Sequence, residues 1–246
     1  MTSTRVNEPG VDPFRIKALF FDVFGTLVDW RGSIARDARA ILSPLGVVVD
    51  WFAFADAWRA QYQPAMDDVR SGRLPFCKLD VLHRRNLDVI LRDFDLDRID
   101  EPARVHLNLA WHRLDAWPDV KPGLRRLHLN YRLAPCSNGN ISLMADLARR
   151  NEFPWDAILG AEIAHDYKPK PIVYRVAAEA FDCAPDEAMM VAAHTSDLIA
   201  AAGVGLRTAF VARPDEFGGG AGENAPGAPV DVSVSSIVEL ADALRS

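Results

Sequence analysis

An apolar run that ends in an aspartate constrains this chain more than any other feature. Residues 17–27 read Lys-Ala-Leu-Phe-Phe-Asp-Val-Phe-Gly-Thr-Leu. The run predicts a buried strand over Leu19–Val23 with the Asp22 carboxylate at its carboxyl end, the edge where open α/β sheets bind ligands. A carboxylate beside backbone N–H groups that face an anion can act as a nucleophile. The other interpretation is that Asp22 only caps a turn, and this motif alone does not decide between the two.

Composition narrows the class of protein. The chain has 246 residues, 49% apolar and 25% charged, which is ordinary for a soluble globular protein. Its net charge is −6 and it has no run of basic residues, so nucleic acid is not expected as a partner. Its apolar stretches are too short to span a membrane. Three scattered cysteines, without a zinc or CxxC pattern, favour a reduced, cytoplasmic protein, and the polar stretch Met1–Pro13 resembles a frayed leader more than a signal peptide.

Strand-like runs alternate with helical patterns over most of the chain. This alternation predicts an α/β fold, a parallel sheet with helices on both faces. The expected strands are Leu19–Val23, Arg132–Cys136, Ala157–Ala161, Ala188–Ala192 and Arg207–Ala212. The expected helices between them are Pro122–Leu129, Ile141–Asn151, Ile172–Phe181 and Leu198–Ala202. The glycine-rich stretch Glu216–Pro229 predicts a flexible surface loop, and Ser235–Ser246 a closing amphipathic helix.

One region breaks the alternation. Apolar residues recur there at three- and four-residue spacing, which is typical of helices. The expected helices are Ser33–Leu45, Trp51–Arg70, Lys78–Leu91 and Glu101–Arg113. We therefore expect a core domain made of residues 14–32 and 116–246, interrupted by a helical cap domain over residues 33–115. A cap placed directly after the first strand could exclude water from Asp22.

Three further polar blocks follow predicted strands. Ser137-Asn138-Gly139 comes first, then Tyr167-Lys168-Pro169, then residues 194–197 (His-Thr-Ser-Asp). Each has a structural explanation of its own: an ordinary turn, a surface lysine, and a carboxylate at a helix N-terminus. Because carboxyl ends of parallel strands share one edge of a sheet, the four blocks together predict a single site around Asp22.

These blocks resemble the four motifs of the haloacid dehalogenase superfamily. The resemblance covers nearly the whole chain and implies a Rossmann-like core with an inserted helical cap. In the phosphatase branch of the superfamily, the first motif resembles Asp-x-Asp, and further acidic residues at the fourth motif bind Mg²⁺. In this chain Phe24 stands where the second Asp of the first motif would be, and no acid lies beside Asp197. The chain looks more like the L-2-haloacid dehalogenase (type II) branch, which implies hydrolysis of short (S)-2-haloalkanoic acids, haloacetates and fluoroacetate being further candidates. No metal and no cofactor are expected.

The resemblance also implies roles for individual residues. Asp22 is the nucleophile that forms an ester, Lys168 polarises it, and Arg59 receives the leaving halide. Asp197 orients Lys168 or helps to activate water. The residues implied to bind the substrate or support its pocket are Val23, Phe24, Thr26, Ser137, Asn138, Phe76 and Tyr174.

The fourth motif departs from the family pattern. Well-known members resemble Ser-Ser-Asn-x-x-Asp, whereas residues 192–197 here read Ala-Ala-His-Thr-Ser-Asp. We expect His194 to replace the asparagine in positioning or activating water, because its ordinary pKa lies near neutrality. A small-molecule phosphatase and a catalytically silent binding protein stay open as alternatives at this point. The apolar faces of the helical insertion suggest a homodimer.

Overall fold

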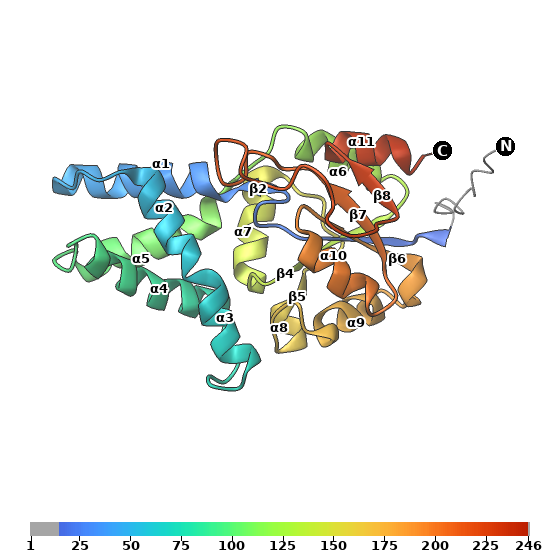
Figure 1. Ribbon diagram of the computed structural model, residues 1–246, viewed down its shortest axis with the longest axis horizontal. Helices are drawn as coiled ribbons and strands as arrows, with labels where there is room; N and C mark the ends of the chain where they lie inside the picture. Colours follow the sequence, from blue (N-terminus) through green and yellow to red (C-terminus); the bar gives the residue numbers. More distant parts are fainter. Residues whose placement is uncertain (1–14, 246) are drawn as a thin grey trace, which may run out of the picture.

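A computed structural model describes residues 15–245 of the chain. The stretch Met1–Pro13 and the end of the expected closing helix at Ser246 lie outside the described residues. Six strands form one parallel sheet in the order β5-β4-β1-β6-β7-β8 (Figure 1). They are β1 (Ala18–Phe21), β4 (Arg132–Ser137), β5 (Leu159–Gly160), β6 (Ala188–Ala192), β7 (Arg207–Val211) and β8 (Val232–Val234).

The first strand lies in the middle of this sheet. Phe21, its last residue, pairs in parallel register with Pro135 of β4 and Val191 of β6. The strands before Asp22, Ser137 and His194 therefore end at the same edge of the sheet. The predicted α/β fold is confirmed, and three of the four polar blocks lie at this edge.

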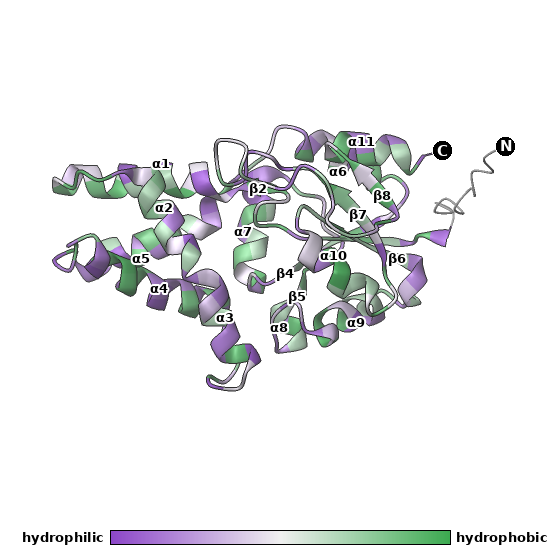
Figure 2. Cartoon of the chain, viewed as in Figure 1, coloured by the Kyte–Doolittle hydropathy of each residue, from purple (hydrophilic) through white to green (hydrophobic). Residues whose placement is uncertain are grey.

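Helices cover both faces of the sheet, because successive strand residues point to opposite sides. Leu19 and Phe21 face one apolar cluster, and Phe20 faces another. The first cluster is packed by α6 (Val120–Leu127), α7 (Ile141–Asn151) and α11 (Ile237–Ala243), the second by α9 (Pro171–Ala180) and α10 (Thr195–Ala202). The short helices α8 (Ala161–Ala164) and η4 (Pro185–Glu187) complete the connections. Figure 2 shows apolar residues gathered where these helices meet the sheet.

Residues 30–113, called the helical segment from here on, lie beside the sheet (Figure 1). The chain enters and leaves this segment through two short antiparallel strands, β2 (Val28–Asp29) and β3 (Asp115–Ala116). Its elements are α1 (Trp30–Leu42), η2 (Ser43–Leu45), α2 (Trp51–Ala60), α3 (Tyr62–Arg70), α4 (Leu79–Asp93), α5 (Glu101–Asn108) and η3 (Leu109–Arg113). The paired strands fix the two ends of the segment next to each other at the edge where β1 ends.

The single helix expected over Trp51–Arg70 is wrong in one respect: it is two helices, with a break at Gln61. Pro64 explains the break. A proline has no N–H to donate to the carbonyl of Ala60, and its ring clashes with a helical carbonyl four residues earlier. Pro64 is accommodated instead in the first turn of a new helix, where a missing N–H costs little.

The glycine-rich stretch Glu216–Pro229 was expected to be a surface loop, and this is wrong for its first residue. Glu216 is only 1% exposed and bonds to His194 and Trp30. Glu223 also reaches inward, to Thr195. Arg213 holds the start of the loop by donating to the Thr26 carbonyl at 2.8 Å.

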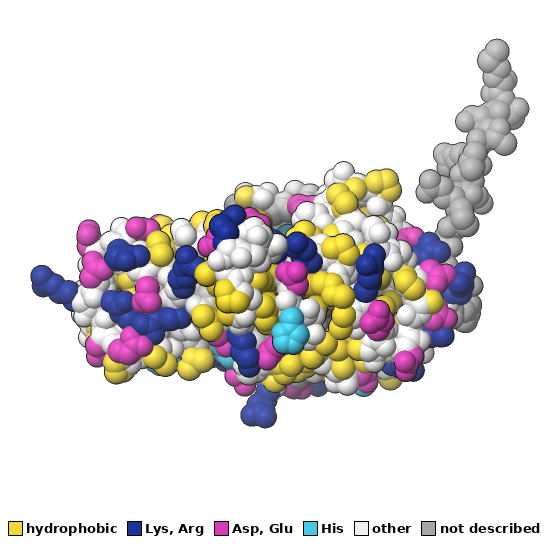
Figure 3. All heavy atoms as spheres, turned by 90° about the horizontal axis from the view of Figure 1, so that it is seen from below, with side chains coloured by type: hydrophobic (Ala, Val, Ile, Leu, Met, Phe, Trp, Pro, Cys, Tyr) yellow, Lys and Arg dark blue, Asp and Glu magenta, His cyan; other side chains and the backbone are white. Residues whose placement is uncertain are grey.

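The surface carries charges of both signs. Figure 3 shows the face seen from below, where basic and acidic side chains are mixed with apolar ones. That face lacks the uniformly basic surface that nucleic acid binds. Across residues 15–245, no helix is both long and apolar enough to cross a membrane.

Candidate active site

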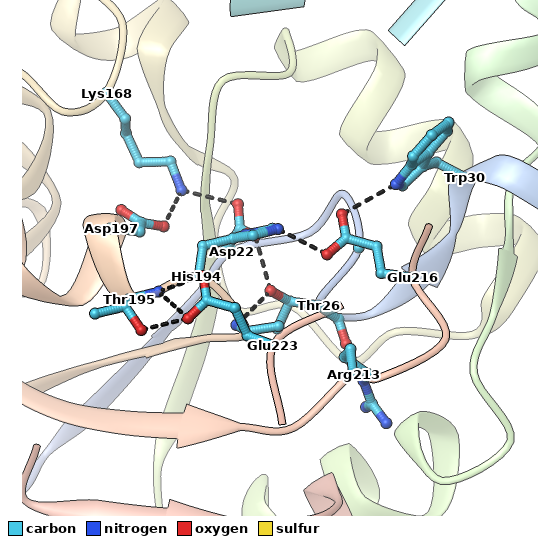
Figure 4. A network of polar contacts seen from close by, with 12 residues as sticks. Asp22, Thr26, Trp30, Lys168, His194, Thr195, Asp197, Arg213, Glu216 and Glu223 are labelled. Carbon is cyan, nitrogen blue, oxygen red and sulfur yellow. Dashed lines mark hydrogen bonds and ion pairs between the residues drawn. The ribbon is translucent and has the colours of Figure 1, made fainter. Parts of the chain in front are cut away.

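The Asp22 carboxylate is the centre of a dense polar network (Figure 4). It lies one residue beyond β1 and is 7% exposed. The Lys168 ammonium donates to Asp22 Oδ1 at 2.9 Å. The Thr26 hydroxyl donates to Oδ2 at 2.8 Å, and Nδ1 of His194 lies 3.1 Å from the same oxygen. Both carboxylate oxygens are thus held in fixed directions.

Charge keeps this carboxylate ionised. Burial by itself raises the pKa of Asp22, but the Lys168 ammonium and the His194 ring outweigh burial and hold that pKa far below its usual value. Burial likewise works against the charge on Lys168, and the Asp197 and Asp22 carboxylates more than compensate, so the pKa of Lys168 is raised. The site therefore holds an anionic Asp22 beside a permanent ammonium ion.

Asp197 supports Lys168 from the other side. It lies in the first turn of α10 and accepts from the Lys168 ammonium at 2.5 Å. The Tyr174 hydroxyl, from α9, donates to the other Asp197 oxygen at 2.5 Å. Burial raises the pKa of Asp197, with the Lys168 charge acting against that rise. Tyr174 and Asp197 thus aim the lysine at Asp22.

His194 is clamped between two carboxylates. Its Nδ1 faces Asp22, and its Nε2 lies 2.9 Å from Glu216 Oε2. Burial lowers the pKa of His194, but the hydrogen bonds to Asp22 and Glu216 raise it to about 10. At neutral pH the ring is an imidazolium that donates to both acids. Glu216 is itself oriented by the Trp30 indole N–H, at 3.0 Å.

A pocket of about 490 Å³ opens in front of Asp22. Charged and aromatic side chains from the sheet edge and the helical segment line it, notably Phe24, Arg59, Tyr62, Arg70 and Lys170. The Arg59 guanidinium lies over the Tyr62 ring at 4.0 Å and over Trp30 at 5.4 Å. Among the described residues, its Nη1 atom is buried with no hydrogen-bond partner. A guanidinium with one buried, unpartnered nitrogen next to a pocket suits a small anion.

Of the remaining residues expected at the site, one lines the pocket and the others do not. Asn138 lines the pocket and holds the Lys168 backbone N–H at 2.8 Å. Ser137 is fully buried, and its hydroxyl accepts from Gly139 N–H. Val23 is part of the apolar core, and Phe76 packs against Tyr167 at 5.4 Å instead of lining the pocket.

Sequence reasoning did not find Glu216, Tyr62 or Trp30. The sequence could have indicated Tyr62, because it follows Arg59 by three residues and so would lie on the same face of the helix expected over Trp51–Arg70. Trp30 follows the first strand by a short connection and is fully buried. Nothing in the local sequence marks Glu216, which sits in a loop rich in glycine. The described part of the chain contains no cluster of three or more His, Cys, Asp or Glu side chains arranged to hold a metal ion.

Comparison with known proteins agrees with this geometry. The family model described as haloacid dehalogenase-like hydrolase matches residues 16–205. This chain belongs to that family. A solved structure of the defluorinating L-2-haloacid dehalogenase Rha0230 is similar to it, with 44% identity, a TM-score of 0.92, and coverage of 94% of this chain and 96% of that one. The L-2-haloacid dehalogenase PA0810 is 43% identical, with a TM-score of 0.90 and coverage of 94% and 99%.

A curated relative extends the likeness within this hydrolase family. The (S)-2-haloacid dehalogenase 4A of Burkholderia cepacia is 27% identical over 232 residues, which cover 92% of this chain and 93% of the relative. The match runs through both the sheet and the helical segment, so the whole chain, and not only its motifs, is similar to these hydrolases.

Proposed function

We propose that this chain hydrolyses short (S)-2-haloalkanoic acids to 2-hydroxy acids through an ester on Asp22. The observation that carries the proposal is the ionised Asp22 carboxylate, fixed by Lys168, Thr26 and His194, facing a pocket in which Arg59 has an unpaired buried nitrogen. The names of similar proteins support it, since three of them are 2-haloacid dehalogenases. One is called defluorinating, which makes fluoroacetate a candidate substrate as well.

In the first step, an oxygen of Asp22 attacks C2 of the substrate. A new carbon–oxygen bond forms as the carbon–halogen bond breaks, and the halide leaves with the electron pair. A halide needs no proton to leave, so Phe24 in place of a second acid is no obstacle. The Arg59 guanidinium would receive the halide in a dry pocket, where its charge acts strongly. Backbone amides of Val23 and Phe24, with Asn138, would orient the substrate carboxylate, and the buried Ser137 would support the turn that carries Asn138.

In the second step, water attacks the carbonyl carbon of the Asp22 ester. Esterification removes the negative charge of Asp22, one of the two acids that keep the proton on His194. The pKa of His194 therefore falls, the ring releases its proton to solvent, and Nδ1 can accept a proton from the attacking water. That proton passes to the alkoxide oxygen as its bond to the acyl carbon breaks, and the 2-hydroxy acid leaves. The proton left on the Asp22 carboxyl group passes to His194, which restores the carboxylate and the imidazolium. Glu216 would hold the Nε2–H and so keep Nδ1 free to act as the base.

We also propose that the helical segment acts as a cap, with domain bounds near residues 33 and 115, that excludes water during the first step. The three free cysteines are consistent with a cytoplasmic location. Large apolar side chains exposed on this segment, such as Val48, Phe52 and Val105, are consistent with a homodimer.

Halide release is the direct test. The protein would be incubated with L- and D-2-chloropropionate, chloroacetate and fluoroacetate, with and without EDTA, alongside Asp22→Asn. We expect halide from the L-isomer in both conditions and none from the variant. Release from the D-isomer alone, or release that persists in Asp22→Asn, would refute the proposal.

A further inference from the structure

Every polar group of Lys168 is held, and the contacts come from both halves of the molecule. Its backbone N–H donates to Asn138 Oδ1 at 2.8 Å, and its ammonium contacts Asp22 and Asp197. Its backbone carbonyl accepts from Nη1 of Arg70 at 2.6 Å. Arg70 is the last residue of α3, whereas the other three residues belong to the sheet side of the pocket. The backbone of the lysine is therefore gripped between the sheet and the helical segment.

The Arg70 side chain is prepared for this contact. It is only 11% exposed, unlike most arginines at a helix end. Asp67 Oδ1 accepts from its Nη2 at 2.7 Å and from its Nε at 3.1 Å, and Gln63 Oε1 accepts from Nη2 at 3.0 Å. These contacts leave Nη1 directed at Lys168. An exposed arginine–aspartate pair on a helix contributes little to stability, so stability alone does not account for a largely covered arginine that reaches across to the sheet side.

A second contact joins the preceding residue to the same region. The hydroxyl of Tyr167, which is fully buried, donates to the Cys77 carbonyl at 2.7 Å. Cys77 lies between α3 and α4, and the neighbouring Phe76 packs on the Tyr167 ring. Two consecutive residues, Tyr167 and Lys168, thus depend on the helical segment for their position.

We propose that Arg70 is a positioning residue that couples the seating of the helical segment over the pocket to the placement of Lys168 against Asp22. The inference rests on the proposed function for the role of Lys168. When the segment moves away, Lys168 loses the contact at its carbonyl, so its backbone is held only by Asn138 from the sheet side, and the direction in which its ammonium approaches Asp22 is less tightly fixed. The carboxylate is then fully prepared for attack only while the pocket is covered, which is when the substrate is shielded from water.

The test compares Arg70→Ala and Arg70→Lys with Arg73→Ala, a matched control. Arg73 lies three residues further on, is 63% exposed and pairs with Asp68. In single-turnover halide release, Arg70→Ala should lower the rate constant roughly 10- to 100-fold with little change in KM. Arg70→Lys should recover part of this loss, and Arg73→Ala should behave like the wild type.

The pH profile adds a measurement that a purely structural role would not change. Because the Lys168 charge helps to keep Asp22 ionised, a loosened lysine should move the acidic limb of the rate profile of Arg70→Ala to higher pH. A rise in KM with an unchanged rate constant would instead identify Arg70 as a charge that attracts anions to the pocket, and would overturn the proposal.

Amide hydrogen exchange over residues 165–170 tests the coupling without turnover. We expect faster exchange in Arg70→Ala than in Arg73→Ala, at equal Tm. Equal exchange in the two variants would refute the coupling even if the wild type released halide. Faster exchange in a protein that releases no halide would leave the contact supported while refuting the proposed function.

Discussion

Two cations share the Asp22 carboxylate, and their surroundings differ. Lys168 is paired with Asp22 and Asp197, so it keeps one anionic partner after Asp22 is esterified. His194 is paired with Asp22 and Glu216 and also keeps one, but its pKa depends on both. A lysine stays charged with one partner, whereas an imidazole can lose its proton near neutrality. The pair can thus combine a fixed charge with a group that becomes a base only after the first step.

Replacing His194 should separate the two steps. In His194→Ala, Asp22 can still displace halide, but ester hydrolysis should slow by about 10²- to 10⁴-fold because the base is missing. Mass spectrometry of the intact protein after addition of L-2-chloropropionate should show the mass of the ester, with about one halide released per chain. His194→Asn, which restores the residue of the family pattern, should hydrolyse the ester faster than the alanine variant. Ester hydrolysis at the wild-type rate in His194→Ala would contradict the assignment.

Glu216 should set the proton affinity of His194. Glu216→Gln keeps the shape of the side chain but removes one of the two charges that raise the pKa of His194 to about 10. We expect the ring to titrate at lower pH in this variant, as measured by NMR of the histidine ring, with His194→Asn used to assign the signal. An unchanged titration would show that Asp22 alone supports the imidazolium.

The sequence predicted Asp22, Lys168, Asp197 and His194 as a group because each follows or lies near the end of a predicted parallel strand. It could not predict Glu216. A glycine-rich loop has the same local sequence whether it covers solvent or a buried histidine, and only the path of the chain after β7 brings this carboxylate to His194.

At the scale of elements, α4 delivers a neutral histidine to an aromatic cluster. His83 is fully buried, stacks on Trp111 at a centroid distance of 4.2 Å and is flanked by Trp58, Tyr62 and Phe24. Neither ring nitrogen has a hydrogen-bond partner among the described residues. Burial lowers the pKa of His83 to about 3. The neutral ring therefore packs against aromatic side chains in the same way as an apolar residue, next to Phe24 and Tyr62 of the pocket.

This histidine should make the protein less stable in mild acid. As pH falls below about 6.5 the unfolded chain takes up a proton at His83, while the folded chain does not until about pH 3. Stability is lost across that window by up to about 1.4 kcal/mol per pH unit. Urea unfolding at pH 7 and pH 5 should show a smaller loss for His83→Gln than for the wild type. His106→Gln, at an exposed histidine, provides the control. If the unfolding free energy of His83→Gln changed with pH as steeply as that of the wild type, this prediction would be wrong.

The elements themselves were predictable to different degrees. Ile141–Asn151 and Ala188–Ala192 coincide with α7 and β6, because the first has apolar residues at helical spacing and the second is a short, continuous apolar run that is buried along its whole length. β2 and β3 have two residues each and β8 has three, too few for any period to show. Such short strands form because the surrounding fold holds their partners in place.

At the scale of the whole molecule, His112 joins the helical segment to the sheet side. It lies in η3, and its Nε2 is 3.1 Å from Asp80 of α4. Its Nδ1 is 2.8 Å from Asp146 of α7, on the other half of the molecule. Asn140, just after the second motif, donates to the same Asp80 at 2.9 Å. One ionisable group therefore connects the two halves of the molecule.

The charge on His112 should stabilise this arrangement over a defined range of pH. Burial lowers the pKa of His112, but the hydrogen bonds to Asp80 and Asp146 outweigh burial and raise it above its usual value of 6.5. A raised pKa in the folded state contributes stability that is fully present below pH 6.5 and is lost as pH rises through the raised value. The difference in unfolding free energy between the wild type and His112→Gln should thus be larger at pH 6 than at pH 9. The pKa of His83 is lowered and that of His112 is raised, so His83→Gln and His112→Gln should change the pH dependence of stability in opposite directions. A loss of stability in His112→Gln that grows towards alkaline pH would show that the ring is neutral where it joins the two halves.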